Sequence, residues 1–323
     1  MFFKVPGTVK EASMIKKDNI LVSCLKFLAV MVVGSVLQSV LILIPVAIKL
    51  ISEGKGDEVA ATMSDTEKLT SVMYSSDLMM VFTLLSTIAL IIITILYCKK
   101  VEERPLTSMG FRRKGCVKEY FKGLLVGFIL MSVVVGIELL TGSLKITGVG
   151  DFSFIAILLL LGMMIGFFIQ SAEEEIMLRG YFLTTLGVHN KIPVAIIVSS
   201  IMFSLIHVFN GSFSFLPFLN ITLIGAFLAL YYIQTDNIWG VAAIHGIWNY
   251  SQGNIYGITV SGIISGNSFL MSEQVKGQEL LNGGSFGAEG GIVATIVVTI
   301  AIILMLVYMY KKGTLVKRSK VTS

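Results

Sequence analysis

Residues 154–179 read FIAILLLLGMMIGFFIQSAEEEIMLR. Most of this stretch is a continuous apolar run, close to the roughly 20 residues that a helix needs to cross a membrane. Its last part is different, because Glu173, Glu174 and Glu175 follow one another and Arg179 comes four residues after the last of them. Ionisable groups are costly at membrane depth. The stretch therefore predicts a membrane helix and marks where the chemistry of the protein is to be sought.

The whole chain has the same apolar character. Hydrophobic residues make up 55% of its 323 residues and charged residues 14%, against about 25% charged residues in a soluble domain. In water such a chain would expose large apolar patches. We therefore predict an all-α fold, a polytopic transmembrane helix bundle with about eight spans. The expected spans are residues 27–49, 78–98, 120–140, 154–179, 193–209, 215–233, 239–254 and 292–310.

The charges of the connecting segments predict the orientation of these spans. Residues 52–77 hold six acids and two bases, residues 99–119 hold seven bases and three acids, and residues 311–323 hold five bases and no acid. Basic segments stay in the cytoplasm, so both termini are expected there, which requires an even number of spans. Residues 258–289, with one base and three acids, are expected outside. The net charge of +5 thus reflects topology, and we expect no nucleic-acid partner.

The chain is expected to be one integral, multi-pass membrane protein, which we assign to a bacterial plasma membrane. Residues 1–119 form a two-span region with its loops, residues 120–257 a catalytic core, and residues 258–323 an external loop, the last span and a basic tail. The three cysteines have no paired spacing, so neither a disulfide framework nor a cysteine zinc site is expected.

The glutamate cluster at residues 173–175 offers one carboxylate without a local partner. Glu175 and Arg179 are four residues apart and share a helix face, so they are expected to pair. Neighbouring residues on a helix differ by about 100° in direction, which leaves Glu174 pointing elsewhere. A partly desolvated carboxylate of this kind suits a general base. The alternative is an ordinary charged helix end in the headgroup region.

Two further polar groups lie in other spans. His207 stands in a run that is otherwise apolar with serines, and His245 and Asn249 are four residues apart, so they share a helix face. An imidazole orients water, moves a proton or binds a metal, and an amide donates to an oxyanion. Each group alone is as well explained as a bonded core residue or a contact between helices. Together with Glu174 they predict one shared cavity, near the cytoplasmic ends of the fourth and fifth spans.

These residues form a familiar set of motifs. Their order and spacing resemble the CPBP family, the CAAX prenyl proteases and bacteriocin-processing proteins also called the Abi family, over about residues 121–254. The motifs are Glu174-Glu175-x-x-x-Arg179, Phe203-x-x-x-His207 and His245-x-x-x-Asn249. The resemblance implies a helical intramembrane endopeptidase with its site inside the bundle.

The resemblance also implies a role for each residue. Glu174 would activate the water and His207 would assist it. His245 and Asn249 would stabilise the oxyanion or hold the water, while Glu175 and Arg179 would give structural support. The family is often described as metalloproteases, but the chain has no HExxH helix. If a Zn²⁺ ion is present, Glu174, His207 and His245 are the expected ligands. We favour a metal-independent mechanism and assign no metal.

The expected partners are membrane lipid and a peptide or lipidated protein substrate. A CAAX-type prenylated C-terminus and a bacteriocin or pheromone peptide are both compatible with the resemblance. Two other functions stay open at this point. One is a non-catalytic immunity or regulatory membrane protein of the same fold. The other is a proton-coupled transporter, against which the chain shows no paired half-repeat.

Overall fold

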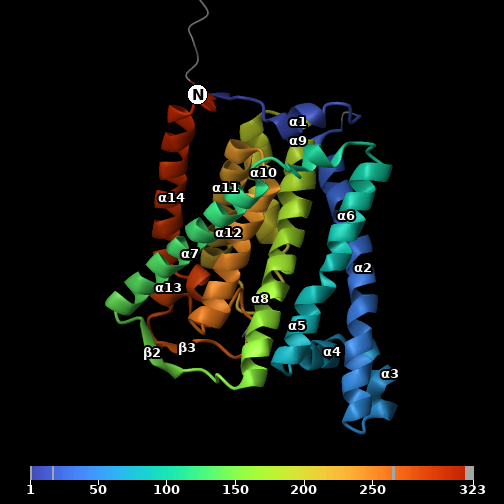
Figure 1. Ribbon diagram of the computed structural model, residues 1–323, viewed down its shortest axis with the longest axis vertical. Helices are drawn as coiled ribbons and strands as arrows, with labels where there is room; N and C mark the ends of the chain where they lie inside the picture. The colour runs from blue at the N-terminus through green and yellow to red at the C-terminus, as the bar shows by residue number, and fades with distance from the viewer. Residues whose placement is uncertain (1, 17, 264–265, 317–323) are drawn as a thin grey trace, which may run out of the picture.

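The protein is a bundle of long helices that run roughly along one axis, as Figure 1 shows. The computed structural model describes residues 2–16, 18–263 and 266–316. The first half of the chain contains β1 (Phe2–Phe3), α1 (Gly7–Glu11), α2 (Ile20–Ser52), η1 (Gly56–Glu58), α3 (Val59–Ser64), α4 (Thr66–Met73), α5 (Asp77–Ser86), α6 (Ile88–Lys100), η2 (Leu106–Met109), α7 (Cys116–Leu140) and β2 (Leu144–Val149).

The second half of the chain carries the residues singled out from the sequence. Its elements are α8 (Phe154–Glu175), η3 (Ile176–Leu183), α9 (Thr184–His189), α10 (Ile192–Leu205), α11 (Phe215–Thr235), α12 (Ile238–Tyr250), η4 (Ser251–Ile255), β3 (Leu270–Gln274), α13 (Glu279–Asn282), η5 (Gly284–Phe286), η6 (Ala288–Gly290), α14 (Ile292–Lys311) and β4 (Leu315–Val316).

Six helical stretches of the described chain are long and apolar enough to cross a membrane. They are Ile20–Ser52, Asp77–Lys100, Cys116–Leu140, Phe154–His189, Phe215–Thr235 and Ile292–Lys311. These six agree with expected spans, and the all-helical membrane fold is confirmed. The count of about eight is not confirmed, because the expected fifth and seventh spans correspond to α10 and α12, which are shorter. Nearly all of α12 is buried by other helices, so it does not need the length that lipid contact requires.

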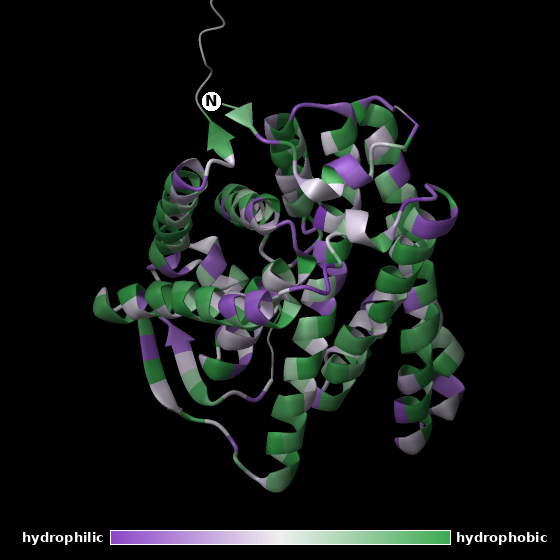
Figure 2. Ribbon diagram, turned by 45° about the horizontal axis from the view of Figure 1, so that its top comes forward, coloured by the Kyte–Doolittle hydropathy of each residue, from purple (hydrophilic) through white to green (hydrophobic). Residues whose placement is uncertain are grey.

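The outer surface of the bundle is apolar, as expected for contact with lipid. Val32, Val36 and Ile44 of α2 are each more than half exposed. Figure 2 shows hydrophobic residues along the lengths of the helices and more hydrophilic ones in many of the connecting segments. The buried interior, in contrast, contains charged side chains such as Glu175 and Arg179. An apolar outer surface together with buried, paired charges fits a protein that has hydrocarbon as its solvent.

The two ends of the described chain meet at one end of the bundle. Strand β1 pairs antiparallel with β4, with Phe2 opposite Val316 and Phe3 opposite Leu315. At the other end, β2 pairs antiparallel with β3, and the register shifts between Ile146 and Gly148. Figure 1 shows β2, β3, α3, α4 and α13 gathered at this second end. The bundle therefore has a terminal face, which holds both chain ends, and an opposite face.

Helix α12 packs closely against both α7 and α8, and these contacts set its position. A Cβ atom on Gly123 of α7 would lie 2.2 Å from the carbonyl oxygen of Gly240, and one on Gly127 would lie 2.3 Å from that of Ile244. Glycines four residues apart allow two helix backbones to approach in this way. The next residue after Ile244 is His245, so the same contact fixes the depth of an expected site residue.

The bundle also brings together the three regions expected from the sequence, whose boundaries stay a prediction. One cluster of buried apolar residues includes Val9 near the start, Leu178 in α8's continuation and Leu315 near the end. Figure 1 shows α14 beside α11 on one side and α2 beside α6 on the other. Helices from the whole length of the chain thus surround α8 and α12.

We expect a cysteine at Glu279, on the opposite face, to react from outside the cell. A cysteine at Lys114, which precedes α7 near the terminal face, should react only after permeabilisation. Both positions are exposed, and positive-inside orientation places them on different sides. The measurement is labelling of intact cells by a membrane-impermeant maleimide, after Cys24, Cys98 and Cys116 are replaced by serine. Equal labelling of both positions in intact cells would show that the orientation is wrong.

Candidate active site

The three glutamates of α8 lie inside the bundle and not at a helix end. Glu173, Glu174 and Glu175 are 5%, 9% and 0% exposed. The helix does not stop at Arg179 but continues as η3 and α9 to His189. The alternative of a charged helix end in the headgroup region is therefore wrong for this cluster. The expected end of the fourth span at Arg179 was too early. The mostly apolar segments η3 and α9 follow the charged residues and extend the helix.

The segment that follows the glutamates is a π-helix, η3, and a second one, η4, follows α12. Such wider turns are rare, and they are frequent at functional sites. The carbonyl oxygen of Gly180 in η3 accepts a hydrogen bond from Arg104 Nη2 at 3.1 Å. Arg104 is itself 2% exposed, so the connection between α6 and α7 secures the irregular turn. No feature of the sequence indicated these two segments.

Glu175 pairs with Arg179, as expected, and also accepts a hydrogen bond from His245. Arg179 Nη1 donates to Glu175 Oε1 at 2.7 Å, and both side chains are fully buried. His245 Nδ1 lies 2.9 Å from the same carboxylate oxygen. A carboxylate accepts, so this ring nitrogen carries the proton and the other, Nε2, is left as an acceptor in the neutral ring. Glu175 thereby fixes the tautomer and the direction of His245.

The guanidinium of Arg179 has two further contacts. Its Nη2 donates to the carbonyl oxygen of Gly225 at 3.0 Å, and its Cζ lies 4.6 Å from the centre of the Phe203 ring. A cation over an aromatic face is attracted to it. The ring of Phe203 also meets those of His207 and His245 edge-on, with centroids 5.0 and 5.7 Å away. Phe203, which the sequence analysis gave no chemical role, separates and orients the charged groups.

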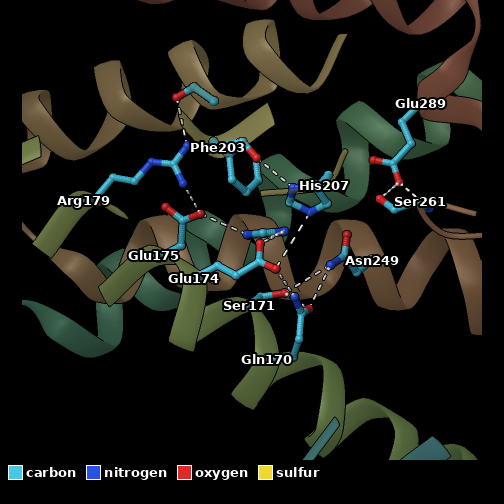
Figure 3. Close-up of polar contacts among 12 residues, drawn as sticks. Gln170, Ser171, Glu174, Glu175, Arg179, Phe203, His207, Asn249, Ser261 and Glu289 are labelled. Carbon is cyan, nitrogen blue, oxygen red and sulfur yellow. Dashed lines mark hydrogen bonds and ion pairs between the residues drawn. The ribbon is translucent and has the colours of Figure 1, made fainter. Parts of the chain in front are cut away.

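His207 lies in the turn just after α10. Its Nδ1 is 2.7 Å from the carbonyl oxygen of Phe203, which can only accept. The proton is therefore on Nδ1, as in His245, and Nε2 points away from the helix. Figure 3 shows the imidazole of His207 directed at Glu174. The Nε2 atoms of His207 and His245 lie 3.9 and 3.8 Å from different oxygens of that carboxylate.

These two gaps are too long for direct hydrogen bonds. A water molecule about 2.8 Å from each atom spans such a gap. For a zinc ion, ligand atoms would have to converge to about 2.0–2.2 Å from one point. No group of three or more histidine, cysteine, aspartate or glutamate side chains is placed to hold a metal in the described residues. The arrangement as it stands does not fit the Zn²⁺ ligand set of Glu174, His207 and His245, and we derive no step through a metal.

Gln170 is a site residue that the sequence analysis missed. Its Nε2 donates to Glu174 Oε1 at 2.5 Å from one turn earlier on α8. Its Oε1 accepts from Asn249 Nδ2 at 3.2 Å, and the same nitrogen lies 3.3 Å from Ser171 Oγ. Asn249 thus reaches Glu174 through Gln170 (Figure 3). The sequence did contain a signal for the contact with Glu174, because residues four apart on a helix share one face.

The four expected catalytic residues, Glu174, His207, His245 and Asn249, line one cavity of about 230 Å³. Its wall also includes Tyr74, Val260 and Ser261, which belong to segments expected outside the cell. His207 lies at the end of α10 that is remote from α9 and the terminal face. The cavity does not lie at the end of the fourth helix, as expected, because this helix continues past Arg179 to His189. Which side of the membrane is nearer to the cavity stays a prediction.

Residues 153–251 match a family model described as Type II CAAX prenyl endopeptidase Rce1-like. The resemblance to the CPBP family is confirmed over this segment. The CPBP match begins later than the expected residue 121, so α7 lies outside it. It includes every expected site residue and Gln170. Searches among curated proteins and among solved structures found no match.

We expect Arg179→Met to lower the free energy of unfolding by about 3–5 kcal/mol, because it leaves the Glu175 carboxylate buried without a cation. The double variant Glu175→Gln/Arg179→Met should recover most of this loss, since no charge is then left unpaired. The measurement is denaturant unfolding in detergent micelles. Equal stability of the wild type and the Arg179→Met protein would contradict the argument.

Proposed function

We propose that the protein is an intramembrane endopeptidase in which Glu174 activates the water that cleaves a peptide bond. One observation carries the proposal: a carboxylate inside the bundle is faced by two imidazole nitrogens across gaps of 3.8–3.9 Å, each of the width that one water spans. The match of residues 153–251 to CAAX prenyl endopeptidases supports the same reaction class. Neither observation depends on the other.

In the proposed reaction the water oxygen attacks the carbonyl carbon of the substrate while Glu174 takes a proton from the water. The carbonyl oxygen becomes an oxyanion. When this intermediate collapses, the C–N bond breaks and the proton on Glu174 passes to the leaving nitrogen. His207, whose Nδ1–H is donated to a neutral carbonyl, stays an acceptor at Nε2 and orients the water.

His245 differs from His207 in its partner. Its Nδ1–H is held by the carboxylate of Glu175, and a carboxylate in this position stabilises an imidazolium. We propose that His245 takes up a proton at Nε2 from solvent before the reaction, donates to the oxyanion, and keeps this proton throughout the cycle. Electrostatic donors of this kind are worth most where bulk water is excluded, and His245 is 6% exposed.

For Asn249 the contacts suggest a supporting role. Its amide nitrogen already donates to Gln170 and Ser171, and Gln170 in turn donates to Glu174. We propose that Asn249 fixes the direction of the Glu174 carboxylate through Gln170. A base must be held within hydrogen-bond reach of the proton it takes, and this relay restrains it from a second helix.

The substrate class follows from the family and from the position of the cavity. The CAAX protease match implies a peptide or a prenylated protein as substrate. Cavity residues such as Tyr74 and Ser261 come from the segments expected outside the cell. We propose that the substrate segment enters from lipid or from that opposite face. A bacteriocin or pheromone precursor peptide fits this direction of entry as a substrate.

We expect Glu174→Gln to lower the cleavage rate by at least about 1,000-fold, because glutamine cannot take the proton. The substrate is first captured with the Glu174→Gln protein in native membranes and identified by mass spectrometry. Cleavage is then measured in proteoliposomes. Glu173→Gln is the matched control, since Glu173 is equally buried but does not line the cavity. A Glu174→Gln protein that cuts at the wild-type rate would rule out the mechanism.

We also expect cleavage to persist after metal removal. Proteoliposomes treated with EDTA and with 1,10-phenanthroline should keep their rate within about twofold, since the proposed chemistry uses only protein groups. Loss of activity that is restored by added Zn²⁺ would instead favour the ligand set of Glu174, His207 and His245.

A further inference from the structure

A second buried carboxylate, Glu289, lies in the wall of the cavity that holds Glu174. It belongs to η6, just before α14, and is outside the segment that matches the family model. The residue is 5% exposed and lines the cavity together with His207 and His245. The proposed cleavage reaction does not use this group, so its presence in the cavity needs another explanation.

Glu289 is held in place by three other parts of the chain. Its Oε1 accepts from the backbone nitrogen of Ser261 at 3.0 Å and from Ser261 Oγ at 2.8 Å. Gln252 Nε2 of η4 lies 3.4 Å from the same oxygen. The backbone oxygen of Glu289 accepts from Asn220 Nδ2 at 2.8 Å. The carboxylate is therefore a positioned group and not a side chain that happens to turn inward.

The other carboxylate oxygen, Oε2, is available to a ligand. Within the described parts of the chain, all hydrogen bonds to the Glu289 side chain go to Oε1. Figure 3 shows the second oxygen on the side of His207. No lysine or arginine is among the described residues that line the cavity, and none of them forms an ion pair with Glu289. Glu174 and Glu289 give the cavity an acidic character.

A buried carboxylate without a cation is unfavourable. Burial accordingly raises the pKa of Glu289. A cationic ligand at Oε2 would restore the charged form and form a charge-assisted hydrogen bond, the stronger kind. Among the described lining residues only His207 and His245 can become cationic, and the Nε2 atoms of both face Glu174 and form no ion pair with Glu289. A peptide, in contrast, commonly carries an ammonium or guanidinium group.

We propose that Glu289 is a substrate-binding subsite that takes a cationic group of the peptide, an ammonium or a guanidinium, next to the bond that is cut. The assignment of Glu289 as a substrate subsite rests on the proposed peptidase function. The binding of a cation to Glu289 can nevertheless be measured without any cleavage. The cation comes either from a lysine or arginine side chain or from a free peptide N-terminus, and the probes separate these two sources.

The first experiment measures binding to the Glu174→Gln protein in detergent micelles, where no probe is consumed. The probes are N-acetyl-lysine amide, which has only a side-chain cation, norleucine amide, which has only an α-ammonium, and N-acetyl-norleucine amide, which is neutral. We expect one cationic probe to bind about 10- to 100-fold more tightly than the neutral one. The stronger of the two cationic probes identifies the source of the charge.

Introducing Glu289→Gln into the Glu174→Gln protein should remove the preference for the cationic probe. The fold should persist, because glutamine keeps an oxygen that accepts the hydrogen bonds from Ser261. Glu289→Lys should reverse it in favour of N-acetyl-glutamate amide. The matched control is Glu273→Gln, an exposed carboxylate on β3, which should change nothing. Equal binding of cationic and neutral probes, or a preference that survives Glu289→Gln, would overturn the subsite.

A second measurement covers the case in which the Glu289 variants do not fold. A diazirine-bearing form of the cationic probe is photo-crosslinked to the Glu174→Gln protein with Glu289 intact, and the labelled peptides are identified by mass spectrometry. Label in residues 258–291 is expected, and label confined to the terminal face would overturn the proposal. Because neither readout involves cleavage, a failed peptidase assay and a failed subsite give different results.

Discussion

The buried contact between Glu175 and Arg179 is the interaction on which the site depends. Both side chains are fully buried, so neither charge is tolerable without the other. The pair does more than neutralise itself, because the same Glu175 oxygen holds His245 and the same guanidinium packs on Phe203. One ion pair thus ties α8 and η3 to α10, α11 and α12. The catalytic groups proposed here are fixed relative to one another by this contact.

Helix geometry explains how adjacent glutamates come to have different tasks. Successive residues on α8 differ by about 100°, so Glu175 turns to Arg179 while Glu174 turns to the cavity. Gln170, one turn earlier, shares the direction of Glu174 and restrains it. The cost of burying Glu175 is offset by a permanent partner. Glu174, in contrast, accepts its hydrogen bond from the neutral amide of Gln170, and no arginine or lysine pairs with it in the described structure.

The sequence indicated which polar residues meet in the cavity better than it indicated the lengths of the helices. Spacing of four residues identified Glu175 with Arg179 and placed His245 and Asn249 on one face, since i,i+4 geometry is local. The extent of the fourth span was missed, because burial by α10, α11 and α12 makes charges tolerable inside a helix that continues to His189. Gln170 was missed because its role comes from Asn249 on another helix. Such long-range contacts leave no periodic pattern.

The cavity wall is divided between the proposed catalytic groups and the proposed peptide subsite. Glu174, His207 and His245 come from the segment that matches the family model, whereas Ser261 and Glu289 come from the segment after it. The first group must meet strict geometric demands, because a misplaced base or water costs rate. The second group contacts the cavity from outside those helices. Changes in the segment between α12 and α14 can therefore alter the charge presented to a peptide without disturbing Glu175, Arg179 or the groups they hold.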